Sequence, residues 1–256
     1  MEQETSPEGR LLFYACDALG DIFVLDEGPH RILTFDYQHE QSRMDLGAPQ
    51  RLVHEHAQSM MMVLAFREPH RAILLGLGGG CLLRALHHLL PQCQIHAIEL
   101  RKKIHEIAEN FFGLPEAPEV TIGIADAREA LENSPAGSAD LILADMFHAN
   151  SVAPLQRRQE FMAECHRVLN ENGWLVANYD GPANTGEPLF HWMGEFFPEI
   201  LLCPIKDENH ILFAGKQKLP DDLEDLHSRV IALGERLEVS LLPLFERVFR
   251  LETKAG

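Results

Sequence analysis

Runs of apolar residues alternate with amphipathic segments from residue 72 onward, and this rhythm predicts the main part of the fold. Five short apolar runs have the pattern of buried strands: AILLGL (72–77), QIHAIEL (94–100), EVTIGIAD (119–126), ADLILAD (139–145) and GWLVANY (173–179). Three segments between them have helical periodicity: CLLRALHHLL (81–90), RKKIHEIAENFF (101–112) and QRRQEFMAECHRVLNEN (156–172). Continuous apolar strands that alternate with helices are typical of a parallel sheet covered on both faces.

The last two predicted strands are connected differently. FFPEILLCPI (196–205) and HILFAGK (210–216) are separated by too few residues for a parallel crossover, so they pair as an antiparallel hairpin or lie apart. Five parallel strands followed by such a hairpin make a seven-stranded, mostly parallel sheet. That sheet is expected of the α/β, Rossmann-like fold of class I S-adenosylmethionine-dependent methyltransferases, and this is the fold that we predict.

Residues 1–48 have another pattern and predict a small N-terminal β-strand domain. Three short segments rich in β-branched and aromatic residues are separated by Gly, Asp and Pro: RLLFYAC (10–16), DIFVLDE (21–27) and RILTFDY (31–37). Residues 49–256 form the second predicted domain, Rossmann-like and suited to an S-adenosyl nucleoside. It begins with a helix over 49–66, in which Met60 to Met62 fill the core, and ends with a helical tail from Pro220. We expect the apolar face of the tail to pack on its own domain, with a dimer contact as the alternative.

Charge and cysteine content narrow the class of protein. The chain has 22 Lys and Arg against 39 Asp and Glu, a net charge of −17, which argues against a nucleic acid or an anionic membrane as partner. The five cysteines are scattered without a CxxC pair, so neither a disulfide framework nor a zinc site is expected. The polar N-terminus is unlike a signal peptide, and the apolar runs are too short to cross a membrane. A soluble cytoplasmic protein is therefore expected.

A glycine cluster between the first apolar strand and the helix that follows predicts a nucleotide-like ligand. Gly76, Gly78, Gly79 and Gly80 let the backbone approach such a ligand, and the helix N-terminus favours an electron-rich group. The dinucleotide fingerprint GxGxxG requires a further glycine where Cys81 stands.

Three acidic residues end successive predicted strands: Glu99, Asp126, which precedes Ala127, and Asp145. Because the carboxyl ends of parallel strands meet at one edge of a sheet, we expect them to face one crevice, with Glu99 placed for ribose hydroxyls. Taken singly, each is as well explained as a helix cap or a loop carboxylate. The set, placed after the glycines, predicts a site for a nucleoside with an alkyl group to donate, and Asp140, at the other end of its strand, is excluded from it.

The succession of motifs resembles the spermidine synthase family of aminopropyltransferases, in its divergent branch. The motifs that carry the resemblance are LDEGPHRILTF, HEHAQSM, ILLGLGGGCLLR, HAIEL, IADAREAL, DLILADMF, APLQRRQEF and GWLVANYDG. The resemblance implies a small N-terminal β-domain, a Rossmann-like catalytic domain, an S-adenosyl-type donor and a homo-oligomer, most simply a homodimer. On this resemblance the donor would be S-adenosylmethionine or its decarboxylated form, and no metal is expected.

The chain departs from the family at the acids that hold amines. The family's GGGDGG motif has an aspartate where this chain has Gly79, and its DxxDP motif has a second aspartate where this chain has His148. The upstream Tyr-His/Gln-Glu signature is matched by His54 and Glu55 without the tyrosine. A carboxylate is the natural partner of the ammonium of decarboxylated S-adenosylmethionine, whereas backbone N–H groups can accept the carboxylate of intact S-adenosylmethionine. The glycine at position 79 therefore favours the intact donor or a different amine site.

Three functions remain open from the sequence. In the first, Asp145 orients or deprotonates an amine that takes an aminopropyl group; a diamine needs a second anionic end, for which Asp180 and Glu187 are distant candidates. His148 is the other candidate catalytic residue, as a base or substrate contact, or it is a solvated loop histidine. The second function is methyl transfer to a small-molecule acceptor, and the third is nucleoside binding without catalysis. His54 and His56 are expected on different faces of a helix, which argues against a metal between them.

Overall fold

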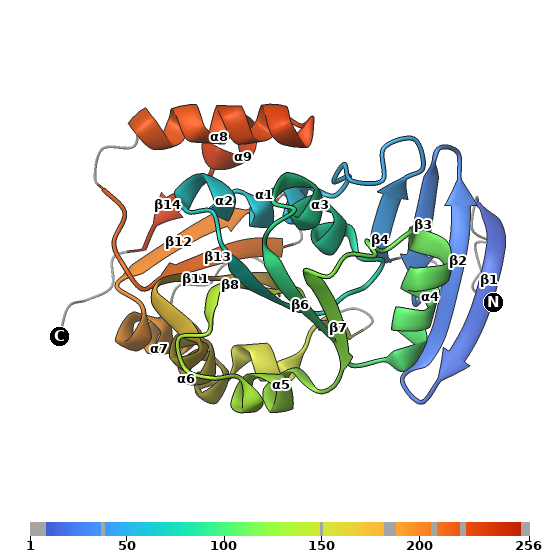
Figure 1. Ribbon diagram of the computed structural model, residues 1–256, viewed down its shortest axis with the longest axis horizontal. Coiled ribbons are helices and arrows are strands. Elements are labelled where there is room, and N and C mark those ends of the chain that lie inside the picture. The colour runs from blue at the N-terminus through green and yellow to red at the C-terminus, as the bar shows by residue number, and fades with distance from the viewer. Residues whose placement is uncertain are drawn as a thin grey trace.

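The computed structural model describes residues 9–36, 39–148, 151–181, 188–205, 209–220 and 224–251. Two of the three β-sheets in the described residues lie side by side, a large one with helices on both faces and a small one formed by the N-terminal strands (Figure 1). Nothing is described of the side chains of His148, Ser151, Val152, Pro188 and Glu224.

The large sheet has the order β14-β12-β13-β11-β8-β5-β6-β7. Its strands are β5 (Arg71–Leu75), β6 (Gln94–Glu99), β7 (Val120–Ile124), β8 (Ala139–Ala144), β11 (Leu169–Asp180), β12 (Glu199–Pro204), β13 (Asn209–Gly215) and β14 (Phe249–Arg250). β7, β6, β5, β8 and β11 pair in parallel, and β13 runs antiparallel between β11 and β12. The five parallel strands and the antiparallel hairpin are thus confirmed.

Two expectations about this sheet need correction. It has eight strands and not seven, because β14 pairs with β12 at its edge. β14 lies in the tail that was predicted to be wholly helical; the tail forms α8 (Glu224–Leu237) and α9 (Leu242–Phe245) before it reaches the sheet.

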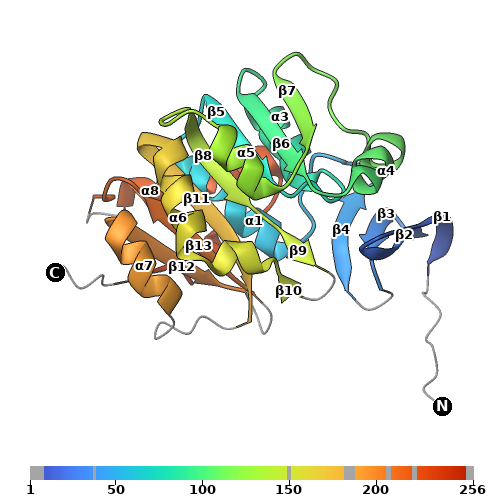
Figure 2. The ribbon, with the colours of Figure 1, turned by 90° about the horizontal axis from the view of Figure 1, so that it is seen from below.

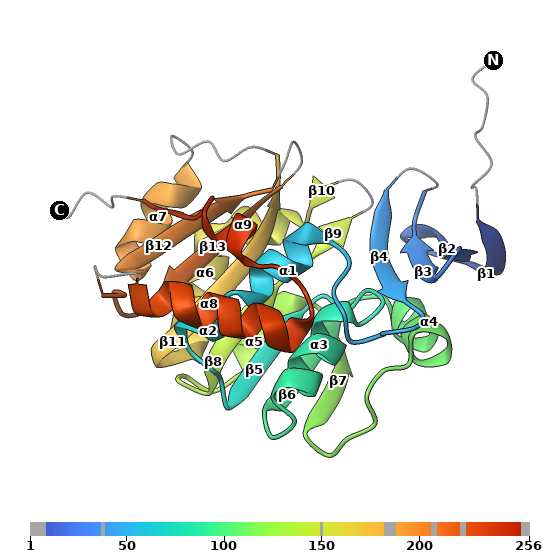
Figure 3. The same cartoon turned by 90° about the horizontal axis from the view of Figure 1, so that it is seen from above.

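Helices cover both faces of the large sheet (Figures 1 and 3). One face carries α1 (Glu55–Met61), α2 (Val63–Phe66), α3 (Cys81–Leu89), α8 and α9; the other carries α5 (Ala127–Asn133), α6 (Gln159–Val168) and α7 (Pro188–Phe196). The buried apolar side of α8 joins the core that contains α1 and α3, so the tail packs on its own sheet as expected. The sequence pattern did not predict α5 or α7.

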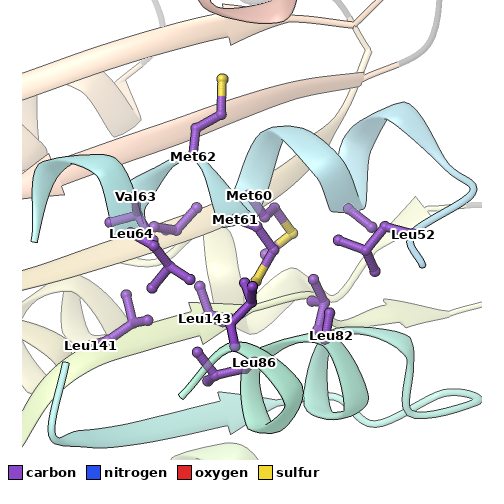
Figure 4. Packing of buried hydrophobic residues seen from close by; sticks show 14 of the residues in the cluster. Leu52, Met60, Met61, Met62, Val63, Leu64, Leu82, Leu86, Leu141 and Leu143 are labelled. Carbon is purple, nitrogen blue, oxygen red and sulfur yellow. The ribbon is translucent and has the colours of Figure 1, made fainter. Parts of the chain in front are cut away.

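The helix expected over 49–66 begins later, at Glu55, and is divided at Met62. Before it, residues 48–51 form a turn, Leu52 forms a β-bridge with Met44, and His54 is extended. Met60, Met61 and Met62 are fully buried, which confirms their role in the core. Figure 4 shows Met60 and Met61 facing Leu82 and Leu86 of α3, while Met62 lies on the opposite side of the helix.

The small sheet contains β1 (Arg10–Asp17), β2 (Gly20–Glu27), β3 (His30–Thr34) and β4 (Glu40–Asp45), all antiparallel. The three predicted strands are confirmed, with β2 and β3 paired as a hairpin, but β4 was not predicted. One face of this sheet packs on α4 (Lys102–Phe112) through a shared apolar cluster, and Arg101 pairs with Asp17 at 2.8 Å. The boundary expected at residue 48 falls in the segment between β4 and α1. The small sheet is thereby held beside the carboxyl end of β6.

No helix among the described residues is long and apolar enough to span a membrane.

Candidate active site

A cavity of about 1060 Å³ opens where the carboxyl ends of the parallel strands meet the small sheet. One wall comes from the loops after β5, β6, β7, β8 and β11, and the other from β4 and the first turn of α1. Figure 2 shows β9 (Phe147–His148) and β10 (Ser151–Val152) on the same side of the molecule as β4. Open α/β sheets bind ligands at this edge, and the volume is enough for a nucleoside donor with an acceptor beside it.

Gly76 and Gly78 line the cavity in backbone conformations that favour glycine, with φ of +93° and +53°. A Cβ atom on Gly76 would lie 2.2 Å from the backbone oxygen of Asp145, and one on Gly78 would lie 2.8 Å from Ser42 Oγ. The loop therefore brings its bare backbone to the cavity because the loops around it leave no room for side chains.

Gly79 and Gly80 point elsewhere and are not among the residues that line the cavity. Gly79 N donates to Ser42 Oγ at 2.8 Å, and a Cβ on Gly79 would lie 2.9 Å from Ser42 Cβ and 3.0 Å from the Phe112 ring. A Cβ on Gly80 would lie 2.2 Å from Leu114. These two glycines pack the loop against β4 and the end of α4, a role that the sequence alone did not distinguish from ligand binding.

Most amides of the loop already have acceptors within the protein. Gly76 N donates to Ile98 O at 2.9 Å, Leu77 N to Glu99 Oε2 at 3.0 Å, and Gly80 N to Leu77 O at 2.8 Å. With Gly79 N bonded to Ser42, four amides are engaged. This arrangement weakens the idea that the loop offers a row of N–H groups to a donor carboxylate.

The three acids and Ala127 all line the same cavity. Glu99 is 8% exposed, and its carboxylate is held by the amides of Leu77 and Arg101. Asp126 caps α5 by accepting a bond from Arg128 N at 2.7 Å, so its helix-cap role is real and leaves its outer face on the cavity.

Asp145 is positioned by a chain of side-chain amides. Asn178 Nδ2 donates to Asp145 Oδ1, and Asn209 Nδ2 donates to Asn178 Oδ1, each at 2.9 Å. Gln156, fully buried, donates from Nε2 to Asn178 O at 2.7 Å and so fixes the strand at that point. Sequence reasoning missed both asparagines, although Asn178, a polar residue inside the apolar run GWLVANY, was a usable signal.

His54 and His56 also lie in this cavity, and their ring centroids are 5.0 Å apart. The expectation that they diverge was wrong, because His54 is the extended residue before α1 and not part of a helix. Desolvation lowers the pKa of His56 to about 4, and the negative charge of Asp145 opposes part of that shift.

Glu40 faces His54 from β4, and its Oε2 lies 3.0 Å from His54 Nε2. Burial alone would raise its pKa, but hydrogen bonds from Arg43 and His54 lower it to about 2. Within the described part of the chain, no group of three or more His, Cys, Asp or Glu side chains is arranged to hold a metal ion.

The remaining candidates are placed as follows. His148 belongs to β9, but its side chain lies outside the described part of the structure, as does Glu187. Asp180 lines the cavity and pairs with Arg157 at 2.8 Å. Asp140 binds the amides of His70 and Arg71 at the opposite end of the sheet, away from the cavity.

Comparison with known proteins agrees with this geometry. A model of the methyltransferase domain matches residues 73–177. The polyamine aminopropyltransferase of Chromobacterium violaceum is 30% identical over 167 residues, a match that covers 64% of each chain; this chain thus spans less than two thirds of that relative.

Two solved structures share the fold over most of its length. A probable spermidine synthase from Corynebacterium glutamicum superposes with a TM-score of 0.75 at 20% identity, covering 92% of this chain and 95% of that one. A spermidine synthase in complex with the transition state analogue AdoDATO gives 0.70 at 17% identity, covering 90% and 81%.

The chain therefore has the class I methyltransferase fold. Its small antiparallel N-terminal sheet and its match to these structures over nearly its whole length give it the spermidine synthase-like form of that fold.

Proposed function

We propose that this protein is a transferase that binds an S-adenosyl-type donor and transfers an aminopropyl group to an amine. The observation that carries the proposal is the position of Asp145. Its carboxylate lies in one cavity with Glu99 and Asp126, and the amide of Asn178 holds it there.

The donor half of the proposed site fits an adenosyl group. Gly76 and Gly78 bring backbone to the cavity where side chains would collide with the protein. Glu99, fixed by two amides, would accept hydrogen bonds from ribose hydroxyls, and Asp126 with Ala127 would meet the base from the next strand end. The donor supplies a sulfonium, which makes the adjacent carbon electrophilic.

At the acceptor half, Asp145 would orient an ammonium and take its proton. The neutral nitrogen attacks the methylene carbon beside the sulfonium, a C–N bond forms, and the C–S bond breaks with its electron pair going to sulfur. The products are the extended amine and a neutral thioether nucleoside. Positioning and proton removal are what the protein contributes to such a displacement.

Methyl transfer is the second candidate, and Gly79 is the observation that favours it. The family's aspartate for the donor amine is absent there, and Ser42 and Phe112 occupy the space that its side chain would need. A donor with an intact methionyl carboxylate would lose no partner at this position.

One experiment separates the two reactions. The purified protein is incubated with an amine and either decarboxylated S-adenosylmethionine or S-adenosylmethionine. The mass of the amine product is then measured by mass spectrometry. An aminopropyl increment with the decarboxylated donor supports the proposal, and Asp145→Asn should lower that rate by about 10²–10⁴-fold while the protein still binds the donor. Glu132→Gln, an exposed change on α5, is the matched control and should leave the rate unchanged. A methyl increment alone would replace the proposal with the second candidate.

A further inference from the structure

Most carboxylates that line the cavity outside the donor half already form ion pairs within the protein, so they are not available to a ligand. Glu40 is bound by Arg43 and His54, Glu55 by Arg247 at 3.1 Å, and Asp180 by Arg157 at 2.8 Å. Each of these carboxylates already has a basic partner within the protein.

Asp145 differs from them. Its side-chain partner is the neutral amide of Asn178, and among the described residues no Arg, Lys or His forms an ion pair with it. Glu99 and Asp126 are likewise bound by neutral groups, but these are backbone amides at the strand ends assigned above to the donor.

The groups that interact with the Asp145 side chain are neutral. Asn178 donates to it and is itself held by Asn209, and His56, neutral near pH 7, is close enough to interact with its charge. The same cavity is lined by the apolar residues Met146, Phe147, Leu155 and Ile205, and by Asp180, which is paired with Arg157.

We propose that the acceptor carries a single amine and an uncharged, largely apolar remainder. This inference rests on the proposed function and names its acceptor class. The amine would bind Asp145, while the remainder would lie against Phe147, Leu155 and Ile205.

A diamine of the same length would bind less well for two physical reasons. Its second ammonium would lose water against apolar side chains, and the cavity residues that the structure describes offer it, outside the donor half, no further carboxylate without a basic partner. To gain one, it would have to displace Arg157 from Asp180 or Arg43 from Glu40, and separating a paired charge is costly. An alkyl end meets neither cost and gains from burial.

The test compares two amines with the same four-carbon chain, butylamine and putrescine, by calorimetric titration of the full chain saturated with 5′-methylthioadenosine. We expect butylamine to bind at least about tenfold more tightly than putrescine, and hexylamine to bind more tightly than butylamine, since a longer alkyl end buries more apolar surface. Asp145→Asn should remove the binding of both monoamines, and Glu132→Gln should not.

Tighter binding of putrescine than of butylamine would overturn this inference and leave the proposed transfer to amines standing. If the protein binds 5′-methylthioadenosine but neither amine, both proposals fail together. Equal affinities would also overturn it, because the second charge would then cost nothing.

Discussion

Asn178 Nδ2 donates a 2.9 Å hydrogen bond to Asp145 Oδ1, and this bond joins the ends of two neighbouring parallel strands. Asp145 is the first residue after β8, its N–H donates to Leu75 O of β5 at 2.9 Å, and Asn178 lies within β11, so the sheet holds the acid although the acid itself begins a loop. Asn209, on the antiparallel strand β13, extends the chain by a second bond to Asn178 Oδ1. Three strands thus determine how Asp145 faces the cavity.

This chain of amides predicts a specific kinetic effect. Asn178→Ala should lower kcat about ten- to a hundredfold, because a hydrogen bond to a charged group contributes about 1.5–3 kcal/mol, and should leave donor affinity nearly unchanged. Asn209→Ala should have a smaller effect. The double variant should be no slower than Asn178→Ala alone, since both changes act through one chain. Rates that fall multiplicatively would show that the two asparagines act separately.

Replacing Gly76 tests how closely the glycine loop approaches the backbone of Asp145. Gly76→Ala places a Cβ 2.2 Å from Asp145 O at a φ of +93°, so both the loop and Asp145 must move. Gly113→Ala is the matched control, because Gly113 also has a positive φ, +59°, with nothing within 4 Å of the added atom. We expect the control to lose about 1–2 kcal/mol of unfolding free energy and to keep donor affinity. Gly76→Ala should lose more unfolding free energy than the control, measured by urea unfolding, and should also lose donor affinity, measured by calorimetry. Equal losses in the two variants would refute the close approach of Gly76 to Asp145.

The sequence predicts the parts of this site that follow from the apolar strand pattern, and it does not predict the parts that depend on side-chain packing. Long apolar runs fix strands, and the end of a strand fixes the edge of the sheet, so Glu99, Asp126 and Asp145 could be assigned to one edge. The direction in which each glycine faces has no such signal. Gly79 is next to Gly78 in the sequence but packs against Ser42, which lies on a strand that was not predicted at all.

The positions of His54 and His56 also could not be predicted from local periodicity. The expected divergence of His54 and His56 assumed a helix that began at Pro49. The real helix begins at Glu55, because residues 48–51 form a turn, Leu52 is bridged to Met44, and His54 is extended. Helix starts depend on such contacts between distant segments, which periodicity does not report.

The low pKa of His56 predicts how stability varies with pH. The folded protein holds this imidazole neutral down to about pH 4, whereas the unfolded chain protonates it near its ordinary value of 6.5. The unfolded state therefore binds more protons between these values, and stability is full above pH 6.5 and falls as the pH drops toward 4. The loss from Glu40, whose pKa is lowered to about 2, falls in a separate window below pH 4.5.

Thermal unfolding between pH 4 and 8 checks this. His56→Gln should flatten the decline between pH 6.5 and 4, and His88→Gln, at an exposed position on α3, should not. A wild-type profile that is flat over this window would contradict the lowered pKa of His56, and a slope unchanged in His56→Gln would assign the pH dependence to other groups.

A substitution at Gly79 tests whether the missing aspartate alone decides which donor the protein binds. Restoring the family's acid as Gly79→Asp is expected to create a site for the amine of decarboxylated S-adenosylmethionine if only the missing charge matters. The packing predicts otherwise, because the new Cβ would meet Ser42 Cβ at 2.9 Å and the Phe112 ring at 3.0 Å, and the side chain would point away from the cavity. We expect Gly79→Asp to lower the unfolding temperature and to bring no gain in affinity for the decarboxylated donor.

Adding Ser42→Gly to this variant should recover part of the stability and still give no gain in donor affinity, because relieving the contact does not turn position 79 toward the ligand. A tenfold gain in either variant would mean that the loop can adopt the family's arrangement and that charge alone separates the two donors.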